Sequence, residues 1–269
     1  MVQHLEYKNI LQFDLLSKYK SLFHFSTTKN GGVSSGNYES FNLSFNSGDE
    51  EENVSENRRR LREILAISEE SVFIPYQTHG DKIIIIDSEV NNKSDEEKAK
   101  LFYGVDALIT HQRNICIAVS TADCVPVLIF DPVKEVIASI HAGWRGTVNK
   151  IVLKTISVMQ EKYACIPSDL IAAIGPSISQ KYFEVGDEVV ESFRNAGFSL
   201  KEIGSINSAT QKMHIDLWEA NKILLIEEGI LLEKIEISGL CTYSNPDMFF
   251  SARRQTIRSG RMLTGAMLV

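Results

Sequence analysis

The chain has 269 residues, of which 43% are hydrophobic and 23% charged, and its formal net charge at neutral pH is −7. These values are typical of one large or two small water-soluble domains with a sizeable core. The negative charge disfavours a nucleic-acid surface, which requires a basic footprint, and no apolar run reaches the roughly 20 residues that cross a bilayer. We therefore expect no nucleic-acid partner and no membrane association.

The first half of the chain is predicted to be rich in strands. Residues 22–28 alternate and are aromatic, as in a strand. A helix is predicted over residues 55–66, because Leu61, Ile64 and Leu65 fall on one face. Residues 91–100 are polar and charged without a core face, and we expect them to form a mobile excursion. Further strands are predicted at residues 72–75, 83–87, 105–110, 115–120, 125–130 and 135–140.

The second half mixes helices and strands. Thr147 is expected to cap a helix over residues 148–162, and Asp216 to cap one over residues 217–228. Another helix is predicted at residues 186–196, strands at residues 170–175, 235–239 and 262–269, and a less regular stretch at residues 199–211. Because strands and helices do not alternate strictly, we expect a mixed α/β (α+β) fold. Layered mixed sheets flanked by helices would form a single domain over residues 1–269.

Three short motifs each carry a residue of a metal-ligating type: His79 in QTHG, Cys124 in STADCVP and His141 in HAGWRG. Each motif lies where an apolar run meets glycine, proline or small residues, so these side chains can converge at strand ends. Two imidazoles and one thiolate are a ligand set of catalytic zinc, which keeps a fourth position open for water or substrate. We predict that the three residues form such a site and that the protein is an enzyme.

Other chemistries also fit these residues. A metal-free cysteine nucleophile would use one histidine as its base, and two histidines with one cysteine also describe a blue-copper centre. The chain has only six histidines, too few for a multicopper enzyme. A fourth protein ligand, such as His111 or Cys241, would instead make the metal structural.

Residues near the motifs are candidates to bind substrate. Asp123 is a candidate acid or base, or a group that holds an imidazole or a substrate amine or hydroxyl. Trp144 offers a flat surface to a planar ligand and Arg145 an anion contact, although a packed tryptophan and an ion-paired arginine are equally compatible with the sequence. A phosphate clamp is a further possibility, since arginine binds phosphate in bidentate fashion; its candidates are Arg253, Arg254 and Arg261.

Longer motifs run through the chain in the order GGVSSGNYESFNL, SENRRRL, QTHG, DALIT, TADCVPVLIFDP, HAGWRGT, GPSI, FEVGDEV, DLWEAN, GLCTYSNPDMFFSARR and SGRM. Together they closely resemble the YfiH family, once labelled a multicopper polyphenol oxidase (laccase) family. The resemblance implies a layered single-domain fold like that of the cytotoxic-necrotizing-factor toxin catalytic domain. It also implies a zinc site with His79, Cys124 and His141 as ligands.

The implied activity is purine nucleoside chemistry. Family members phosphorolyse adenosine, inosine and methylthioadenosine to free base and ribose 1-phosphate, and they deaminate adenosine. A bacterial branch is linked to peptidoglycan-precursor editing, which here would be hydrolysis that uses Cys124. A mononuclear copper (Cu2+) polyphenol oxidase is the other alternative to a zinc (Zn2+) enzyme.

The resemblance leads to a mechanistic hypothesis with a nucleoside and phosphate as small-molecule partners. Asp123 acts as acid or base beside the metal. The predicted substrate contacts are Lys29, Asn42, Arg58, Gln77, Arg145 and Arg254. Lys29 stands where the family commonly has arginine, and lysine lacks the bidentate fork. The N-terminal sequence has no basic region followed by an apolar one, so we expect no signal peptide and a cytoplasmic enzyme.

Overall fold

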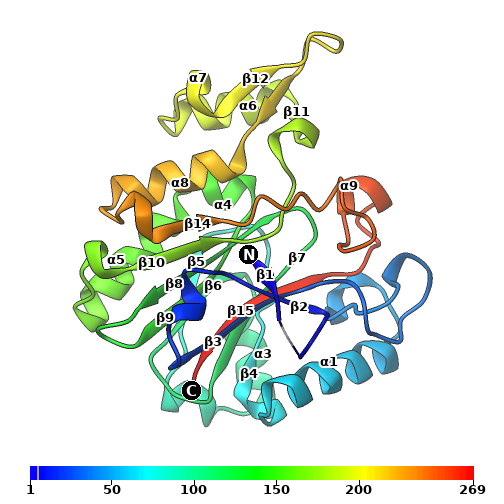
Figure 1. Ribbon diagram of the computed structural model, residues 1–269, viewed down its shortest axis with the longest axis vertical. Helices are drawn as coiled ribbons and strands as arrows, with labels where there is room; N and C mark the ends of the chain where they lie inside the picture. Colours follow the sequence, from blue (N-terminus) through cyan, green and yellow to red (C-terminus); the bar gives the residue numbers. More distant parts are fainter. Residues whose placement is uncertain (5) are drawn as a thin grey trace.

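Two sheets packed face to face form the centre of the molecule (Figure 1). The structure is a computed structural model that describes residues 1–4 and 6–269. The first sheet has the order Val2–Gln3 (β1), Ile10–Gln12 (β2), Leu22–Thr27 (β3), Met262–Leu268 (β15), Cys116–Thr121 (β7) and Val72–Phe73 (β4). The second has the order Ile235–Ile237 (β14), Ile171–Ile174 (β10), Val125–Asp131 (β8), Val136–Ala142 (β9), Val105–Thr110 (β6) and Lys82–Ile85 (β5).

Both faces of the second sheet are buried, as strand β9 illustrates. Val136, Ala138 and Ile140 belong to the core beneath the helices, whereas Ile137 belongs to the core between the two sheets. Side chains alternate along a strand, so His141 lies on the same face as Ile137 and points toward the first sheet. The inner face of β9 thus begins with apolar Ile137 and becomes polar at Ser139, which donates to the Thr264 carbonyl of the first sheet, and at His141.

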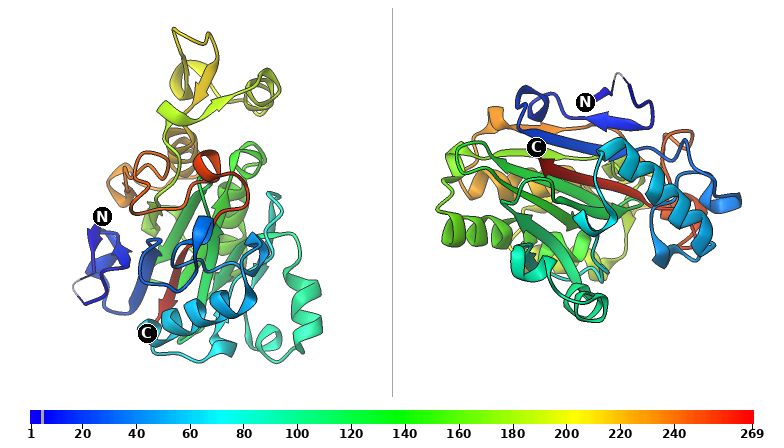
Figure 2. Two further views of the ribbon diagram at one scale, coloured as in Figure 1. Left: turned by 90° about the vertical axis from the view of Figure 1, so that its right-hand side faces the viewer. Right: turned by 90° about the horizontal axis from the view of Figure 1, so that it is seen from below.

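Helices cover the outer faces of the two sheets, which gives four layers (Figure 2). Leu61 packs on the first sheet with Phe25, and Ile156 packs on the second sheet with Leu224 of a neighbouring helix. The helices are Glu51–Leu65 (α1), Ser88–Asn91 (α2), Asp95–Phe102 (α3), Trp144–Val148 (α4), Ile151–Tyr163 (α5), Asp187–Asn195 (α6), Leu200–Ile203 (α7), Leu217–Glu227 (α8) and Ala252–Gln255 (α9). The predicted mixed α/β fold with layered sheets is confirmed.

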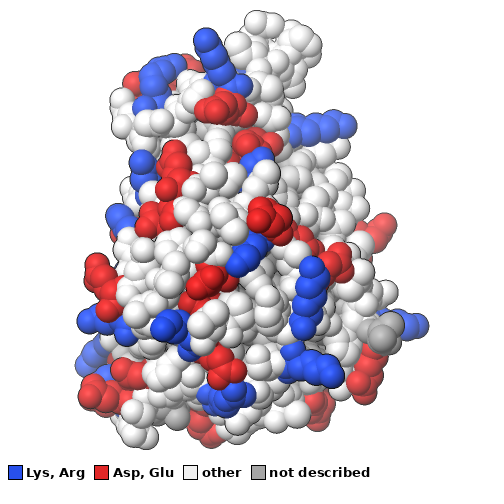
Figure 3. All heavy atoms as spheres, turned by 60° about the vertical axis from the view of Figure 1, so that its left-hand side comes forward, with Lys and Arg blue, Asp and Glu red and all other residues white. Residues whose placement is uncertain are grey.

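A third, small sheet projects beyond the sandwich together with α6 and α7, at the top of Figure 1. Its strand order is Glu184–Val185 (β11), Met213–Ile215 (β13) and Gly204–Ile206 (β12). The stretch predicted to be less regular thus contains a helix and a strand. On the face shown in Figure 3, acidic and basic side chains are interspersed. Within the described residues, no helix combines the length and hydropathy that crossing a membrane requires.

Two local predictions missed features of the structure. Residues 91–100 contain most of α3, because Ser94 and Glu97 form a capping box that satisfies the first backbone N–H groups of the helix. The helix predicted to follow Thr147 is split into α4 and α5 at Lys150, whose φ of 57° is left-handed. Thr147 lies inside α4 and donates a hydrogen bond to the Ala142 carbonyl instead of capping a helix.

His24 on β3 should make the fold sensitive to mild acid. It is fully buried between the sheets, and its Nε2 accepts a hydrogen bond from the Phe13 N–H at 2.8 Å. Burial lowers the pKa of His24 from 6.5 to about 4, so the unfolded chain binds the proton more readily and stability falls as the pH drops below 6.5. Between pH 7.5 and 5 we expect a loss of about 2 kcal/mol from this residue.

Urea unfolding at the two pH values measures this effect. His24→Gln, which keeps an acceptor for Phe13 but does not titrate, should show a smaller loss than the parent. Equal losses in the two proteins would show that His24 is not the group responsible.

Candidate active site

The candidate site lies at one end of the sandwich, where the chain crosses between the sheets. His79 belongs to the connection that leaves β4 in the first sheet and enters β5 in the second. Cys124 ends the shorter connection between β7 and β8, which makes the same crossing. His141 is near the end of β9 and pairs with Pro126 of β8. Residues far apart in sequence therefore meet because the fold brings these segments to one end.

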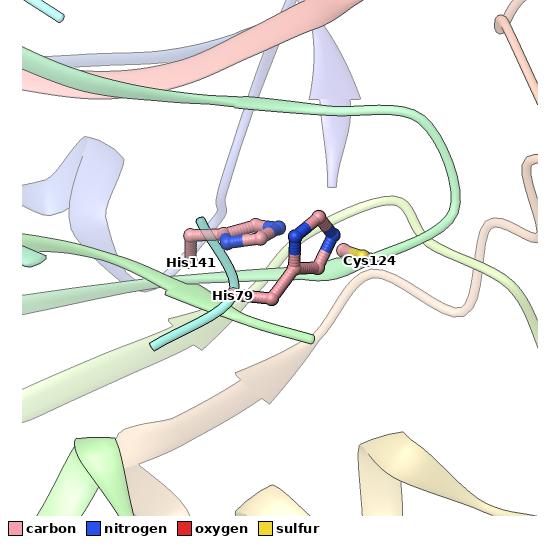
Figure 4. Close-up of side chains that lie close together, drawn as sticks. All are labelled: His79, Cys124 and His141. Carbon is pink, nitrogen blue, oxygen red and sulfur yellow. The ribbon is translucent and has the colours of Figure 1, made fainter. Parts of the chain in front are cut away.

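The three side chains converge (Figure 4). Their candidate ligand atoms all lie within 4.8 Å of one another, and the two imidazole rings meet nearly edge to face at 4.9 Å between centroids. His141 is only 3% exposed, Cys124 is half-buried and His79 is exposed. The cluster is thus anchored on the buried side and open to solvent on the other.

Backbone conformation contributes to this convergence. Gly143 lies directly against the cluster, where a Cβ atom would stand 3.1 Å from Cys124 Sγ and 3.3 Å from His79 Cδ2. His79 and Asp123 have positive φ angles of 63° and 90°. Non-glycine residues in this region are strained and concentrate at functional sites. Because Gly143 has no side chain, it leaves room for the side chains of Cys124 and His79.

Asp106 on β6 holds two of the three residues in place. Its Oδ1 lies 2.7 Å from His141 Nδ1 and accepts the His79 N–H at 3.1 Å, while its Oδ2 accepts the Gly80 N–H at 2.7 Å. Because Nδ1 of His141 is occupied, Nε2 is the nitrogen left to bind a ligand. Asp106 was not predicted as a site residue, although a lone acid near the start of an apolar strand is the signal that could have revealed it.

Charges in the cluster favour a thiolate on Cys124. Burial raises the pKa of this thiol, but the neighbouring His141 and His79 outweigh burial and hold the pKa well below its usual value. Burial lowers the pKa of His141, because it disfavours the charged imidazolium. Cys124 and Asp106 outweigh burial and raise this pKa above its ordinary value. The thiolate is the form of cysteine that binds a metal ion, whereas histidine binds as the neutral imidazole, so His141 gives up a proton when a metal binds.

Metal-free protein should therefore alkylate readily at Cys124. We expect the pH midpoint of iodoacetamide modification to lie at least about one unit below the value near 8.5 of a free thiol. Mass spectrometry of the modified peptide gives the rate at each pH. Cys116, whose pKa burial raises to about 12, serves as an internal control that stays unmodified. A midpoint for Cys124 at or above 8.5 would contradict the electrostatic description.

A cavity of about 650 Å³ opens beside the cluster. Its wall includes three aromatic side chains, Tyr76, Trp144 and Phe183, which offer apolar surface to a planar ligand. Its polar lining residues include Ser44, Asn46, Gln77, Ser120, Asp123, Arg253 and Arg261. An apolar wall with a few convergent polar groups is typical of a small-molecule site.

Three predicted site residues take part in building this wall. Asp123 lines the cavity, but its Oδ1 accepts from Thr242 Oγ1 at 2.6 Å and its Oδ2 from the Arg253 N–H at 2.7 Å. The amide of Gln77 also lines the cavity and exchanges hydrogen bonds with the backbone of Ser120. Asn42 is fully buried behind the wall. Asp123 and Gln77 are therefore braces as well as candidate contacts, whereas Asn42, which was predicted to contact substrate, does not line the cavity and braces the wall from behind.

The predicted cationic contacts lie elsewhere. None of Lys29, Arg58, Arg145 and Arg254 is among the described residues that line the cavity. The guanidinium of Arg145 is 4.4 Å from the ring centroid of Trp144, so it meets the cavity only through that ring. Arg254 donates to the Tyr243 carbonyl and covers the ring of that residue. Sequence alone could not assign these directions, because long side chains follow tertiary packing.

In the described residues, His79, Cys124 and His141 are the single group of three potential metal ligands with this proximity. His111 contacts Tyr163, and Cys241 accepts a hydrogen bond from the Ser179 N–H, so neither completes the cluster. The fold and this cluster define a layered α/β protein with a three-residue metal-type site that opens into a cavity.

The chain belongs to the YfiH family, and the family model described as "Multi-copper polyphenol oxidoreductase laccase" matches residues 23–269. A relative from Bacteroides thetaiotaomicron named "Purine nucleoside phosphorylase" is 44% identical over 97% of each chain. "Adenosine deaminase RL5", from an unknown prokaryote, is 39% identical over 94% of this chain and 97% of its own. The crystal structure of YlmD from Geobacillus stearothermophilus matches with a TM-score of 0.89 and 31% identity, over 99% of this chain and 98% of that one.

Proposed function

We propose that this protein is a zinc-dependent purine nucleoside enzyme of the cytoplasm. It phosphorolyses adenosine, inosine and methylthioadenosine to free base and ribose 1-phosphate, and it deaminates adenosine as a side activity. The observation that carries the proposal is the convergence of His79, Cys124 and His141 at the mouth of a cavity with an aromatic wall. Similar chains named for these two activities support it.

The three residues fit zinc by donor type and by orientation. Thiolate and imidazole are ligands that zinc prefers, and Asp106 turns His141 so that Nε2 is available. With three protein ligands, a position remains for a substrate atom. When bound there, zinc supplies a Lewis acid that stabilises negative charge developing on a substrate oxygen.

The chain itself supplies binding and orientation. A cavity of about 650 Å³ has room for a nucleoside with phosphate beside it. Tyr76, Trp144 and Phe183 bind the purine through their apolar faces, and the partly enclosed wall restricts water. Asp123 can act as acid or base only by exchanging one of the hydrogen bonds that its carboxylate already makes.

Product analysis tests the proposal. The purified protein is incubated with adenosine, with and without phosphate, and adenine, inosine and hypoxanthine are separated by chromatography. We expect adenine only when phosphate is present and inosine under both conditions. Inosine and methylthioadenosine are tested as further substrates. If nucleosides remain unchanged while a peptidoglycan precursor is hydrolysed, the editing alternative replaces the proposal.

The family description favours copper as the competing metal. A multicopper enzyme needs a second cluster of imidazoles, and the described residues contain one group of three ligands. A blue-copper centre adds an axial methionine, yet no described residue that lines the cavity is a methionine. Metal analysis of protein purified without added metal distinguishes the two, since stoichiometric copper with a blue absorption band would support the oxidase.

A further inference from the structure

Two arginines line the cavity, Arg253 and Arg261, and neither forms an ion pair with an acidic residue in the described part of the chain. Arg261 immediately precedes β15, whose first residue, Met262, pairs with Thr121. Thr121 leads into the connection that carries Cys124, so the backbone of Arg261 lies beside the metal-type site. Both Arg261 and Cys124 line the cavity. The cation therefore stands where a negatively charged substrate would meet it.

The guanidinium of Arg261 is held in place by neutral acceptors. Nη1 donates to the carbonyls of Ser259 and Gly260 at 2.6 and 3.0 Å, and Nη2 donates to the Ile257 carbonyl at 3.0 Å. These contacts orient the side chain but do not neutralise its charge. Arginine has five N–H donors in a planar fork, and Nε–H with the second Nη2–H has no partner in these contacts. These two donors are available to an oxyanion, which arginine can bind in bidentate fashion.

A polar loop in the same wall is tied to Arg261. Asn42 Oδ1 accepts hydrogen bonds from both the Arg261 N–H at 2.9 Å and the Ser44 N–H at 3.2 Å. Ser44 Oγ in turn accepts the Asn46 N–H. Ser44 and Asn46 both line the cavity, so the bracing brings a hydroxyl and an amide into the same wall as the cation.

The carboxylate of Asp123 acts electrostatically on Arg261 but makes no hydrogen bond with its guanidinium in the described residues. Its two oxygens accept hydrogen bonds from Thr242, Ser251 and the backbone N–H of Arg253. Arg253 also lines the cavity, but its side chain is exposed and reaches the carbonyl of Glu184. Arg261 is thus the half-buried cation of the wall, and a half-buried charge interacts with an anion more strongly than an exposed one.

We infer that Arg261, with Ser44 and Asn46, forms the subsite that binds inorganic phosphate, which rests on the proposed function. A phosphate oxygen held there bonds to C1′ of the ribose as the bond from C1′ to the purine nitrogen breaks. The electron pair of the broken bond goes to the base, which takes up the proton that the phosphate gives up. Deamination uses water in place of phosphate, so this subsite serves only one of the two reactions.

Arg261→Met tests the inference, with adenosine as the common substrate of both reactions. We expect the KM for phosphate to rise at least about tenfold, as for loss of a charge-assisted contact, and the ratio of phosphorolysis to deamination to fall by a similar factor. For Arg261→Lys we expect a KM for phosphate between those of Arg261→Met and the parent, because lysine keeps the charge but not the planar fork. Arg258→Met, an exposed residue of the same loop that does not line the cavity, is the matched control and should behave like the parent.

The outcomes separate the inference from the proposed function. If the parent performs neither reaction, the proposed function is wrong and the inference falls with it. If the parent performs both and Arg261→Met lowers them equally, or raises the KM for adenosine instead, the phosphate subsite is wrong. If Arg261→Met does not fold, the exposed Asn46→Ala decides: a raised KM for phosphate supports the subsite, and an unchanged one contradicts it.

Discussion

Replacing Cys124 with alanine should lower kcat/KM for adenosine phosphorolysis by about a thousandfold or more. The substitution removes the thiolate from a three-residue site, and with it the Lewis acid, which contributes several kcal/mol to stabilising the transition state. Deamination should fall in parallel, because the proposed mechanism gives both reactions the same metal. Steady-state rates of adenine and inosine formation measure the effect.

Cys116→Ala is the control for this substitution. Cys116 is a fully buried cysteine in β7 and belongs to the core under α1, so its loss should lower stability but change kcat/KM less than about twofold. Full activity in Cys124→Ala would show that the cluster does not carry the reaction. Retained metal with lost activity would instead favour a direct nucleophilic role for the thiolate.

Asp106→Asn should weaken zinc binding by about 10- to 100-fold, which is the usual cost of losing a carboxylate that orients a ligating histidine. The amide keeps the size of the side chain, but one of its two acceptor atoms becomes a donor. It can no longer accept from both the His79 and Gly80 N–H groups while it orients His141. Competition with a chromogenic chelator gives the zinc Kd directly, without an activity assay.

Asp131→Asn provides a matched control. Asp131 is another buried carboxylate at a strand end, but it accepts the N–H groups of Val133 and Lys134 in a turn. We expect this variant to lose stability and to keep the zinc Kd of the parent. Equal zinc affinity in Asp106→Asn and the parent would show that Asp106 serves stability alone.

The sequence predicted the components of the site better than their surroundings. His79, Cys124 and His141 were identifiable because each is a ligand-type residue in a motif where an apolar run meets glycine, proline or small residues. Their convergence depends on two connections that cross between sheets, and periodicity alone does not show which strands share a sheet. The longer strands of the two large sheets were predictable from their apolar runs, whereas the short strands β1 and β2 and the third sheet were not predicted.

Interactions that depend on tertiary structure were harder to predict. Asp106 gives no local signal of its partners, which lie 26 to 35 residues away in sequence. Arg58 and Arg254 are plausible anion contacts by residue type, yet their guanidinium groups stack on Phe45 and Tyr243. The capping box of α3 was present in the sequence, but the polar composition of that stretch outweighed it in the prediction.

Removal and restoration of the metal test the central claim most directly. The protein is stripped with a chelator, and adenosine phosphorolysis is measured as zinc is added back. The account predicts that activity disappears on stripping and returns in proportion to zinc up to one equivalent per chain, and that Cys124→Ala does not respond. Undiminished phosphorolysis by the stripped protein, or restoration of activity in Cys124→Ala, would contradict it.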